Sequence, residues 1–568
     1  MRFLFRIIFI LFFIVISLIL LDIVLKPVFN SPNVIITYGL HPFDISTEKP
    51  ILWSYIKKIY IISYVFSTII ISNSFFQKFI FKKLDFKKRN KNSNIISENE
   101  LNLFIGNNSE NNEKIFIPEK GLFQNILITG TIGTGKTSSA MYPFTEQLIK
   151  YDKQKIGMLI LDVKGNFYKK VSEICAKYER EDDLLILELG GNIRYNPLHK
   201  PNLKPIVLAN RLKTVLTLFS QNNSDSYWLD KAEEVISECI KLCRLYNNGY
   251  VTFLEIHKLI NFPNYYKEKI DFLRTIFQSG KLSQNETYDL LSSLEFFETE
   301  FKLLDQRVLS IIKSEITRIT SPFISELTIL NTFSPERSNL NFKGFSEIIN
   351  NGKILVLNMK IAEYKNLSKI IAAYLKLDFQ SEVLSSISSN TNITAFISDE
   401  FHEYITSTDS DFFAQSREAK CVNIVATQSY TSLLNTLKDQ NLVKSITQNL
   451  INKLWFRTDD IFTIEEAQKQ IGKEEKIKKS KSISENAKET NFDYFSNTLK
   501  STDSNISESI STYTQNDFIY DTSFFSQKLE TFSCLGFLST GNKILAPTKI
   551  NMIPYFKNNF NSKKNSFI

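Results

Sequence analysis

The sequence predicts an α/β fold with a mostly parallel sheet, and three features support this prediction. Short apolar runs alternate with helical stretches, as in sheets that carry helices on both faces. A glycine-rich loop follows the apolar run at residues 126–128, and two carboxylates follow the run at residues 395–398. Ligands of such sheets bind at the carboxyl ends of the strands. We therefore expect the functional site at that edge.

The glycine-rich loop at residues 130–137 has the phosphate-binding spacing G-x-x-x-x-G-K-[ST]. Its glycines allow a tight turn that points successive N–H groups at phosphate oxygens. We expect Lys136 to reach the β- and γ-phosphates and Thr137 to bind Mg²⁺. The alternative, a chance glycine-rich turn, is disfavoured by the strand before it and the helix after it. The predicted nucleotide-binding residues are Gly130, Thr131, Ile132, Gly133, Thr134, Gly135, Lys136, Thr137, Ser138 and Asp162.

Asp399 and Glu400 end a second apolar strand. In an ATPase, the first carboxylate would hold Mg²⁺ through water, and the second would act as general base on the attacking water. Strands often end in acids, so this pair is informative only together with the phosphate loop. The combination predicts Mg²⁺-dependent hydrolysis. No guanine-reading Asn-Lys-x-Asp sequence occurs, so we expect ATP rather than GTP.

Two further residues flank the apolar run at 422–426. Gln428 follows it and could sense the γ-phosphate or orient water, or it could be an ordinary hydrogen-bonded turn residue. Arg417 precedes it and is either a surface salt-bridge residue or a charge aimed at a neighbour's nucleotide. We expect Arg417 at the nucleotide-binding rim of the sheet.

The first part of the chain has membrane character. Residues 7–21 and 59–76 carry no charge, and about 18–20 such residues span a bilayer as a helix. A cleaved signal peptide is the alternative for the first run, but no clear cleavage site follows it. Basic residues precede the first run and follow the second. The positive-inside rule then predicts a two-pass protein with both termini and the ATPase domain in the cytoplasm.

Composition also predicts the remaining boundaries. Five scattered cysteines indicate reduced thiols rather than a disulfide framework, and the net charge of +8 allows an anionic partner. The predicted parts are a membrane hairpin at 1–90, a linker at 91–114, a nucleotide-binding core at 115–202 and 331–557, an all-helical insertion at 203–330, a mobile Ser/Lys/Asn-rich segment at 476–516 and a polar tail at 558–568.

The order of these motifs resembles the TraG/TraD-type coupling proteins of type IV secretion. The resemblance rests on the two membrane runs, the phosphate loop and the short sequences at 162–165, 195–198, 399–400, 416–417 and 426–428. One departure is Val163, where the family commonly has proline.

The resemblance implies a RecA-like ATPase core that carries an all-α domain. Such proteins form hexamers at the inner membrane and deliver relaxase–DNA complexes or protein substrates to the secretion channel during conjugation. It also implies residue roles: Lys136 and Thr137 for phosphate and Mg²⁺, Asp399 and Glu400 for hydrolysis, Gln428 as sensor and Arg417 as a finger supplied in trans.

Two other functions remain open from the sequence. An FtsK-like DNA translocase usually carries a C-terminal winged-helix domain, and no helical segment of that size follows Leu538. A membrane-anchored adaptor could bind nucleotide and effector proteins without moving nucleic acid. For a DNA-transport motor we expect sequence-nonspecific binding through phosphates and DNA-stimulated hydrolysis.

Overall fold

The structure is a computed structural model of the 568-residue chain. It describes residues 15–16, 50–75, 100–162, 164–218, 226–359, 361–387, 392–485, 490–493, 498–501 and 506–557. The chain divides into two compact units, Met1–Glu98 and Asn99–Ile568.

In the first unit, the apolar run at residues 59–76 lies almost entirely within α4 (Pro50–Phe75). The other predicted membrane run, at 7–21, falls outside the described residues except for Val15 and Ile16. Within the described part of the chain, we find no helix with the length and apolar character needed to cross a membrane.

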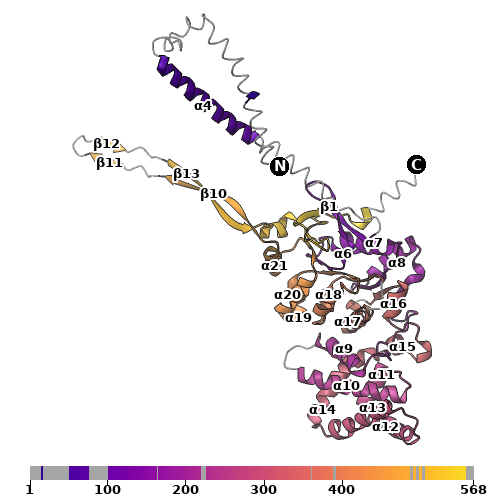
Figure 1. Cartoon of the computed structure of the whole chain (residues 1–568). Helices are drawn as coiled ribbons and strands as arrows, with labels where there is room; N and C mark the ends of the chain where they lie inside the picture. The colour runs from indigo at the N-terminus through magenta and orange to yellow at the C-terminus, as the bar shows by residue number, and fades with distance from the viewer. Residues whose placement is uncertain are drawn as a thin grey trace. The chain divides into compact units, whose positions relative to one another are not determined.

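An eleven-stranded sheet forms the centre of the second unit (Figure 1). The strand order is β2-β1-β15-β14-β9-β3-β8-β7-β4-β6-β5, and the strands from β9 to β5 pair in parallel. The prediction of an α/β fold with a mostly parallel sheet is therefore confirmed. The strands are β1 (Asn102–Asn108), β2 (Lys114–Pro118), β3 (Ile126–Thr129), β4 (Gly157–Leu161), β5 (Leu184–Glu188), β6 (Ile354–Asn358), β7 (Thr394–Ser398), β8 (Cys421–Thr427), β9 (Asn452–Phe456), β14 (Ser533–Phe537) and β15 (Thr548–Asn551).

The antiparallel strands at one end of the sheet begin earlier in the chain than the predicted boundary of the core. Residues 91–114 are predicted to be a linker, but β1 begins at Asn102 and pairs with β2 and β15. The buried side chains of Leu103 and Ile105 lie on either side of the partly exposed Phe104, which is the pattern of a strand with one covered face. The surrounding Asn and Glu residues hid this short pattern in the sequence.

Helices cover both faces of the parallel strands. Along β3, Leu127 belongs to one hydrophobic cluster, whereas Ile126 and Ile128 belong to another on the opposite face. A strand buried on both faces must be apolar at every position, which explains the continuous apolar runs of the sequence. The helices of this layer include α7 (Tyr142–Lys150), α8 (Phe167–Lys177), α16 (Phe345–Asn351), α17 (Ile361–Ser385), α18 (Asp409–Gln415), α19 (Tyr430–Leu437), α20 (Gln440–Asn449) and α21 (Ile461–Ile471).

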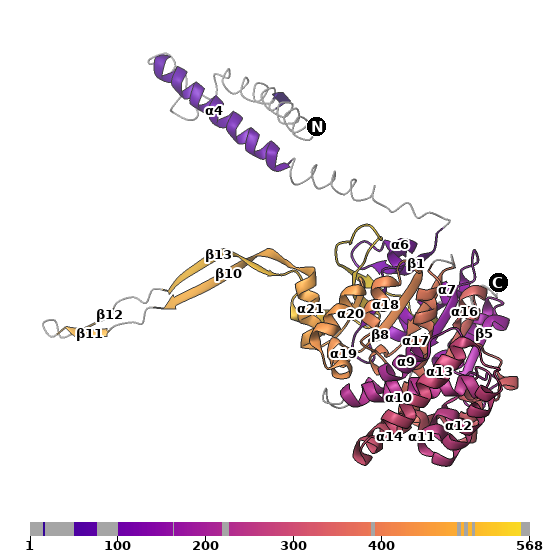
Figure 2. The same ribbon diagram turned by 60° about the horizontal axis from the view of Figure 1, so that its bottom comes forward.

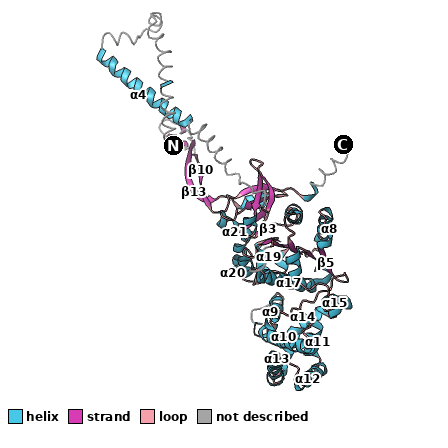
Figure 3. Ribbon diagram, turned by 45° about the vertical axis from the view of Figure 1, so that its right-hand side comes forward, coloured by secondary structure: helices cyan, strands magenta, loops and turns pink. Residues whose placement is uncertain are grey.

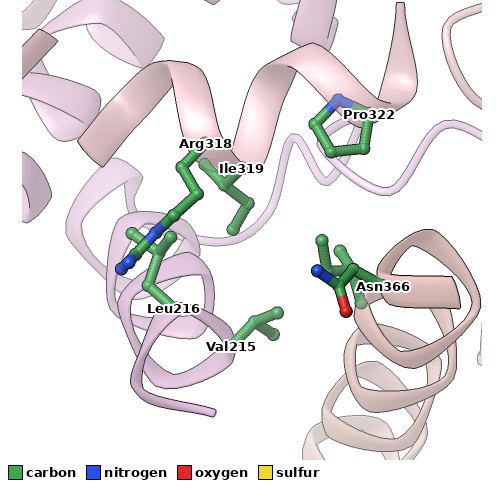
Figure 4. A pocket seen from close by; sticks show the side chains of 7 residues that line it. Val215, Leu216, Arg318, Ile319, Pro322 and Asn366 are labelled. Carbon is green, nitrogen blue, oxygen red and sulfur yellow. The ribbon is translucent and has the colours of Figure 1, made fainter. Parts of the chain in front are cut away.

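The stretch predicted to be an all-helical insertion folds as a group of helices (Figure 3). They include α9 (Pro205–Thr217), α10 (Ser226–Tyr246), α11 (Phe253–Asn261), α12 (Pro263–Gln278), α13 (Gln284–Glu295), α14 (Gln306–Thr320) and α15 (Leu327–Phe333). Asp378 of α17 ties this group to the core, because its carboxylate binds Arg211 of α9 at 2.7 Å and Lys200 at 2.6 Å. Beside this junction, a pocket of about 100 Å³ separates Val215 and Ile319 from Asn366 (Figure 4).

The segment at 476–516, predicted to be mobile, pairs regularly in its described residues. Strand β10 (Lys473–Glu485) runs antiparallel to β13 (Ile506–Phe518), and β11 (Thr490–Asp493) pairs with β12 (Thr498–Ser501) (Figure 2). The polar composition did not indicate these strands, because a strand ladder is held by backbone hydrogen bonds that do not need apolar side chains. The mobility of the segment stays a prediction.

Candidate active site

The glycine-rich loop connects β3 to a helix, as its spacing predicts. Gly130, Gly133 and Gly135 have φ angles of 156°, 80° and 95°, which residues with a side chain rarely adopt. A Cβ atom at Gly135 would also clash with the ring of Phe532. Thr137–Met141 forms a single π-helical turn that leads into α7. The backbone thus makes the tight glycine turn between a strand and a helix that a phosphate-binding loop requires.

Neighbouring strands fix the loop from both sides. The N–H of Gly130 donates to the carbonyl of Gln428 at 3.2 Å, which follows β8. Thr131 donates to the carbonyl of Arg457, after β9, from its N–H at 2.9 Å and its hydroxyl at 3.1 Å. Ile132 is 78% exposed at the tip of the loop. The loop is thus held at its base and open at its tip.

Lys136 lies inside the loop and is only 7% exposed. Its ammonium donates to the carbonyl oxygens of Gly130 and Thr131. Burial lowers the pKa of Lys136, while the charges of Glu400 and Asp399 act in the opposite direction. The lysine therefore sits where a positive charge is balanced by nearby acceptors.

Thr137 and Asp399 meet at the carboxyl edge of the sheet. The Thr137 hydroxyl donates to Asp399 Oδ2 at 2.9 Å, although the two residues are far apart in the sequence. Burial raises the pKa of Asp399, which is 1% exposed. In the described residues, no group of three or more His, Cys, Asp and Glu side chains is placed to hold a metal. A hydroxyl and one carboxylate fit Mg²⁺, which proteins commonly bind through few side chains together with phosphate oxygens.

Glu400 is held in a defined position beside this pair. Its backbone adopts the left-handed region, with φ 49° and ψ 47°, which is uncommon for a residue with a side chain. Lys164 binds Oε1 at 2.7 Å and Gln428 Nε2 donates to Oε2 at 3.3 Å. Burial by itself would raise the pKa of Glu400, but the hydrogen bond and charge of Lys164 outweigh it and lower the pKa. Glu400 is consequently a carboxylate at neutral pH.

Asp162 contacts the start of α8 in the structure, and its predicted part in nucleotide binding stays a prediction. Its carboxylate accepts hydrogen bonds from the backbone N–H groups of Lys164, Asn166 and Phe167 at 2.9–3.0 Å. These contacts involve both oxygens and position the start of α8. The hydroxyl of Ser138 likewise turns back to the Gly135 carbonyl at 3.3 Å.

The structure corrects the predicted position of Arg417. This exposed residue lies between α18 and β8, before the first residue of the strand. Gln428 follows the last residue of the same strand. Because β3, β7 and β8 are parallel, their amino ends share the edge opposite the phosphate loop. Seven strand residues span about 20 Å. Arg417 therefore lies away from the nucleotide-binding edge of its own subunit.

Three residues that we did not assign from the sequence complete this edge. Lys164 binds Glu400, and the only hint was its place two residues after Asp162. His402 lies 3.7 Å from Glu400 and 3.2 Å from the Thr427 hydroxyl, and burial lowers its pKa. Half-buried Arg457 adjoins the loop through its carbonyl. No local pattern marks it, because its position follows from β9 lying next to β3.

A buried ion pair anchors the segment that follows Glu400. Lys376 of α17 binds Asp409, and it also donates to the Tyr404 carbonyl at 2.8 Å and the Thr406 hydroxyl at 2.9 Å. Lys376 and Asp409 are both completely buried. Every donor of this lysine has an acceptor, so the pair fixes the loop against the helix.

Comparison with known proteins gives one family match and several structural matches. Residues 394–515 match the family model described as the TraM recognition site of TraD and TraG. None of the curated protein sequences matches the chain significantly.

Three solved structures of the conjugative coupling protein TrwB share the fold. The unbound form lacking the N-terminal part (TrwBdeltaN70) has a TM-score of 0.52 and 12% identity, with 77% of this chain and 87% of that chain covered. The complex with ADP and Mg²⁺ has a TM-score of 0.51 and 12% identity, covering 77% and 87%. The complex with the GTP analogue GDPNP gives 0.50 and 12%, covering 77% and 86%. The resemblance to TraG/TraD-type coupling proteins is thus confirmed by the family match and the fold.

Proposed function

We propose that this chain is a coupling protein of type IV secretion, which uses ATP hydrolysis to move substrates to the secretion channel during conjugation. The TrwB fold over 77% of the chain and the family match at 394–515 support this function. The one observation that carries the ATPase assignment is the contact of Thr137 with Asp399 at 2.9 Å, beside Lys136 and Glu400.

Each residue of the site has a separate task in this proposal. Lys136 stabilises the negative charge of the β- and γ-phosphates, and Thr137 and Asp399 hold Mg²⁺. When bound, Mg²⁺ supplies positive charge that polarises the phosphate oxygens. TrwB has been crystallised with ADP and Mg²⁺ and with a GTP analogue. We propose ATP as the nucleotide here, since the guanine-reading sequence is absent.

Glu400 acts as general base in this scheme. A carboxylate oxygen can accept more than one hydrogen bond. Lys164 and Gln428 can therefore orient Glu400 while one of its oxygens takes a proton from the attacking water. Gln428 also touches the loop through its carbonyl, so it links the base to the phosphate-binding backbone.

The proposed partners are nucleic acid and protein. DNA would be bound without sequence preference, together with a relaxase or with effector proteins. The description of the matching family adds a TraM-type protein as a candidate partner. We propose a homo-hexamer, in which Arg417 would reach a neighbour's nucleotide, because in its own subunit it lies at the opposite edge of the sheet.

ATP hydrolysis by the whole chain tests the enzymatic part. We expect turnover that stops when Mg²⁺ is chelated and rises with single- or double-stranded DNA. DNA affinity should fall steeply as salt increases, because phosphate contacts release counterions. Turnover that ignores DNA, combined with salt-independent binding, would instead favour the adaptor function.

The shared site has its own test. Arg417→Ala and Lys136→Ala should each be nearly inactive, since an arginine finger is worth about 10³–10⁵ in rate in other enzymes. When the two variants are mixed, some interfaces combine an intact Lys136 with an intact Arg417, so part of the activity should return. Glu418→Ala is the matched neighbour that should stay active. A co-assembled mixture with no recovery would contradict the role of Arg417.

A further inference from the structure

A second polar pocket lies away from the phosphate loop. It has a volume of about 300 Å³ and is formed by α19, α20, α21 and the start of β9. Lys444 and Lys469 have side chains that are 46% and 58% exposed, and they mark its mouth, whereas Lys453 forms its interior. We call it the Lys453 pocket. Its size is that of pockets that take small ligands or single side chains.

Lys453 is buried without a partner. The residue is 2% exposed, and its ammonium makes no hydrogen bond to any described residue. Burial lowers the pKa of Lys453 to about 8, so the side chain still carries a charge at neutral pH. An isolated buried charge is unfavourable unless something compensates it. The interior of the pocket therefore lacks an acceptor or an anion.

A tyrosine hydroxyl in the same pocket also lacks an acceptor. Tyr430 Oη is buried and has no acceptor among the described residues. The indole of Trp455 lies near this hydroxyl, but an indole N–H can only donate. Lys453 and Tyr430, which both line the pocket, thus have donor groups without an acceptor among the described residues.

Glu466 is the one carboxylate among the residues that line the pocket, and it does not compensate the charge of Lys453. Glu466 lies 3.1 Å from Lys469 and 3.8 Å from Lys444, so it is paired with the lysines at the mouth. Three lysines against one glutamate leave the pocket positive. Its charge and its free donors both select a negatively charged acceptor.

We propose that the Lys453 pocket binds a carboxylate side chain on an acidic peptide segment of a protein partner. The depth of Lys453 decides between a protein and DNA. A glutamate side chain is a narrow stem with the anion at its tip, so it can approach the buried Lys453 side chain from the pocket. A backbone phosphate of DNA carries a sugar on each side, which prevents such insertion. The proposal concerns a site separate from ATP hydrolysis and does not depend on it.

Binding of a blocked hexaglutamate peptide to the whole chain tests this proposal. The labelled peptide should bind saturably by fluorescence anisotropy, whereas hexaglutamine should not. Lys453→Met removes the charge and keeps the length of the side chain, and it should weaken binding at least about tenfold. Lys281→Met removes an exposed lysine from a distant helix connection and should leave binding unchanged. ATP turnover checks that each variant is folded.

A rim variant keeps the test valid if Lys453→Met does not fold. Lys444→Gln combined with Lys469→Gln should weaken peptide binding by a smaller factor than Lys453→Met, since these side chains are exposed and partly paired with Glu466. Equal affinity of Lys453→Met and the unmodified chain would overturn the proposal. Competition by a thymidine oligonucleotide or by inorganic phosphate, in place of the peptide, would show a phosphate site and would also overturn it.

Discussion

Lys136 in the phosphate loop and Lys453 in the second pocket are both buried, and burial lowers the pKa of both. Their surroundings differ. Lys136 donates to two carbonyls and faces two carboxylates, whereas Lys453 has no partner among the described residues. The first site balances its charge before a ligand arrives, and the second does not. The acceptors around a buried lysine, rather than its depth, therefore separate these two kinds of site.

The largest expected effect comes from Lys136. Lys136→Ala should abolish ATP hydrolysis, because no other residue of the loop at 130–137 carries a positive charge. Turnover is measured with Mg²⁺ and saturating ATP. Lys453→Met serves as the matched buried-lysine variant and should keep turnover near that of the unmodified chain. Undiminished hydrolysis by Lys136→Ala would remove the basis of the ATPase assignment.

The next largest effect on hydrolysis is expected from Glu400, one of the two carboxylates near Lys136. Glu400→Gln should bind ATP and hydrolyse it about 10²–10⁴-fold more slowly, which is the usual loss of a general base. Loss of ATP binding instead would indicate a structural or metal-binding role for Glu400.

Lys164→Met sharpens this assignment through pH. Lys164 lowers the pKa of Glu400, so its removal should raise that pKa. Because the base must be ionised, the acidic limb of kcat/KM against pH should then move to higher pH. An unchanged limb would show that another group controls it.

A third buried lysine, Lys376, has an acceptor for every donor, and its removal tests how much such a pair contributes to stability. Lys376→Met leaves Asp409 buried without its cation, and breaking a buried pair commonly costs about 3–5 kcal/mol of stability. Chemical denaturation should show this loss in the core. Replacing both residues by apolar ones should recover part of it, whereas an equal loss in both variants would point to packing alone.

Lys453→Met should have the opposite and smallest effect. The folded-state pKa of about 8 lies below the unfolded value of 10.5, so folding disfavours the charged form. The penalty is fully present below pH 8 and disappears as the pH rises toward 10.5. At pH 7 the variant should be more stable by about 3 kcal/mol, and the gap to the unmodified chain should close at high pH. Lys281→Met should show no such gap. A destabilised Lys453→Met variant with a pH-independent difference would contradict an unpaired lysine.

The phosphate loop, the paired acids Asp399 and Glu400 and the parallel sheet that carries them could all be predicted from the amino-acid sequence. These features depend on short-range spacing. A glycine turn after a parallel strand and an acid at a strand end both lie at the carboxyl edge of the sheet, whatever the position of the strand in it. The expectation that Gln428 lies at the carboxyl end of a strand followed from the same argument, whereas its contact with the loop depends on β8 lying beside β3.

Positions that depend on strand order and helix packing could not be predicted in this way and became visible in the folded chain. The fold places Arg417 at the far edge and brings Arg457 to the loop through β9. In the structure, the carboxylate of Asp162 accepts hydrogen bonds from the start of α8, and β1 joins the sheet at its antiparallel end. Lys453 is the clearest case, since a lysine in an apolar run predicts neither its burial nor the lack of an acceptor. Both result from three helices closing over one strand, and no local pattern records which side chains they leave unpaired.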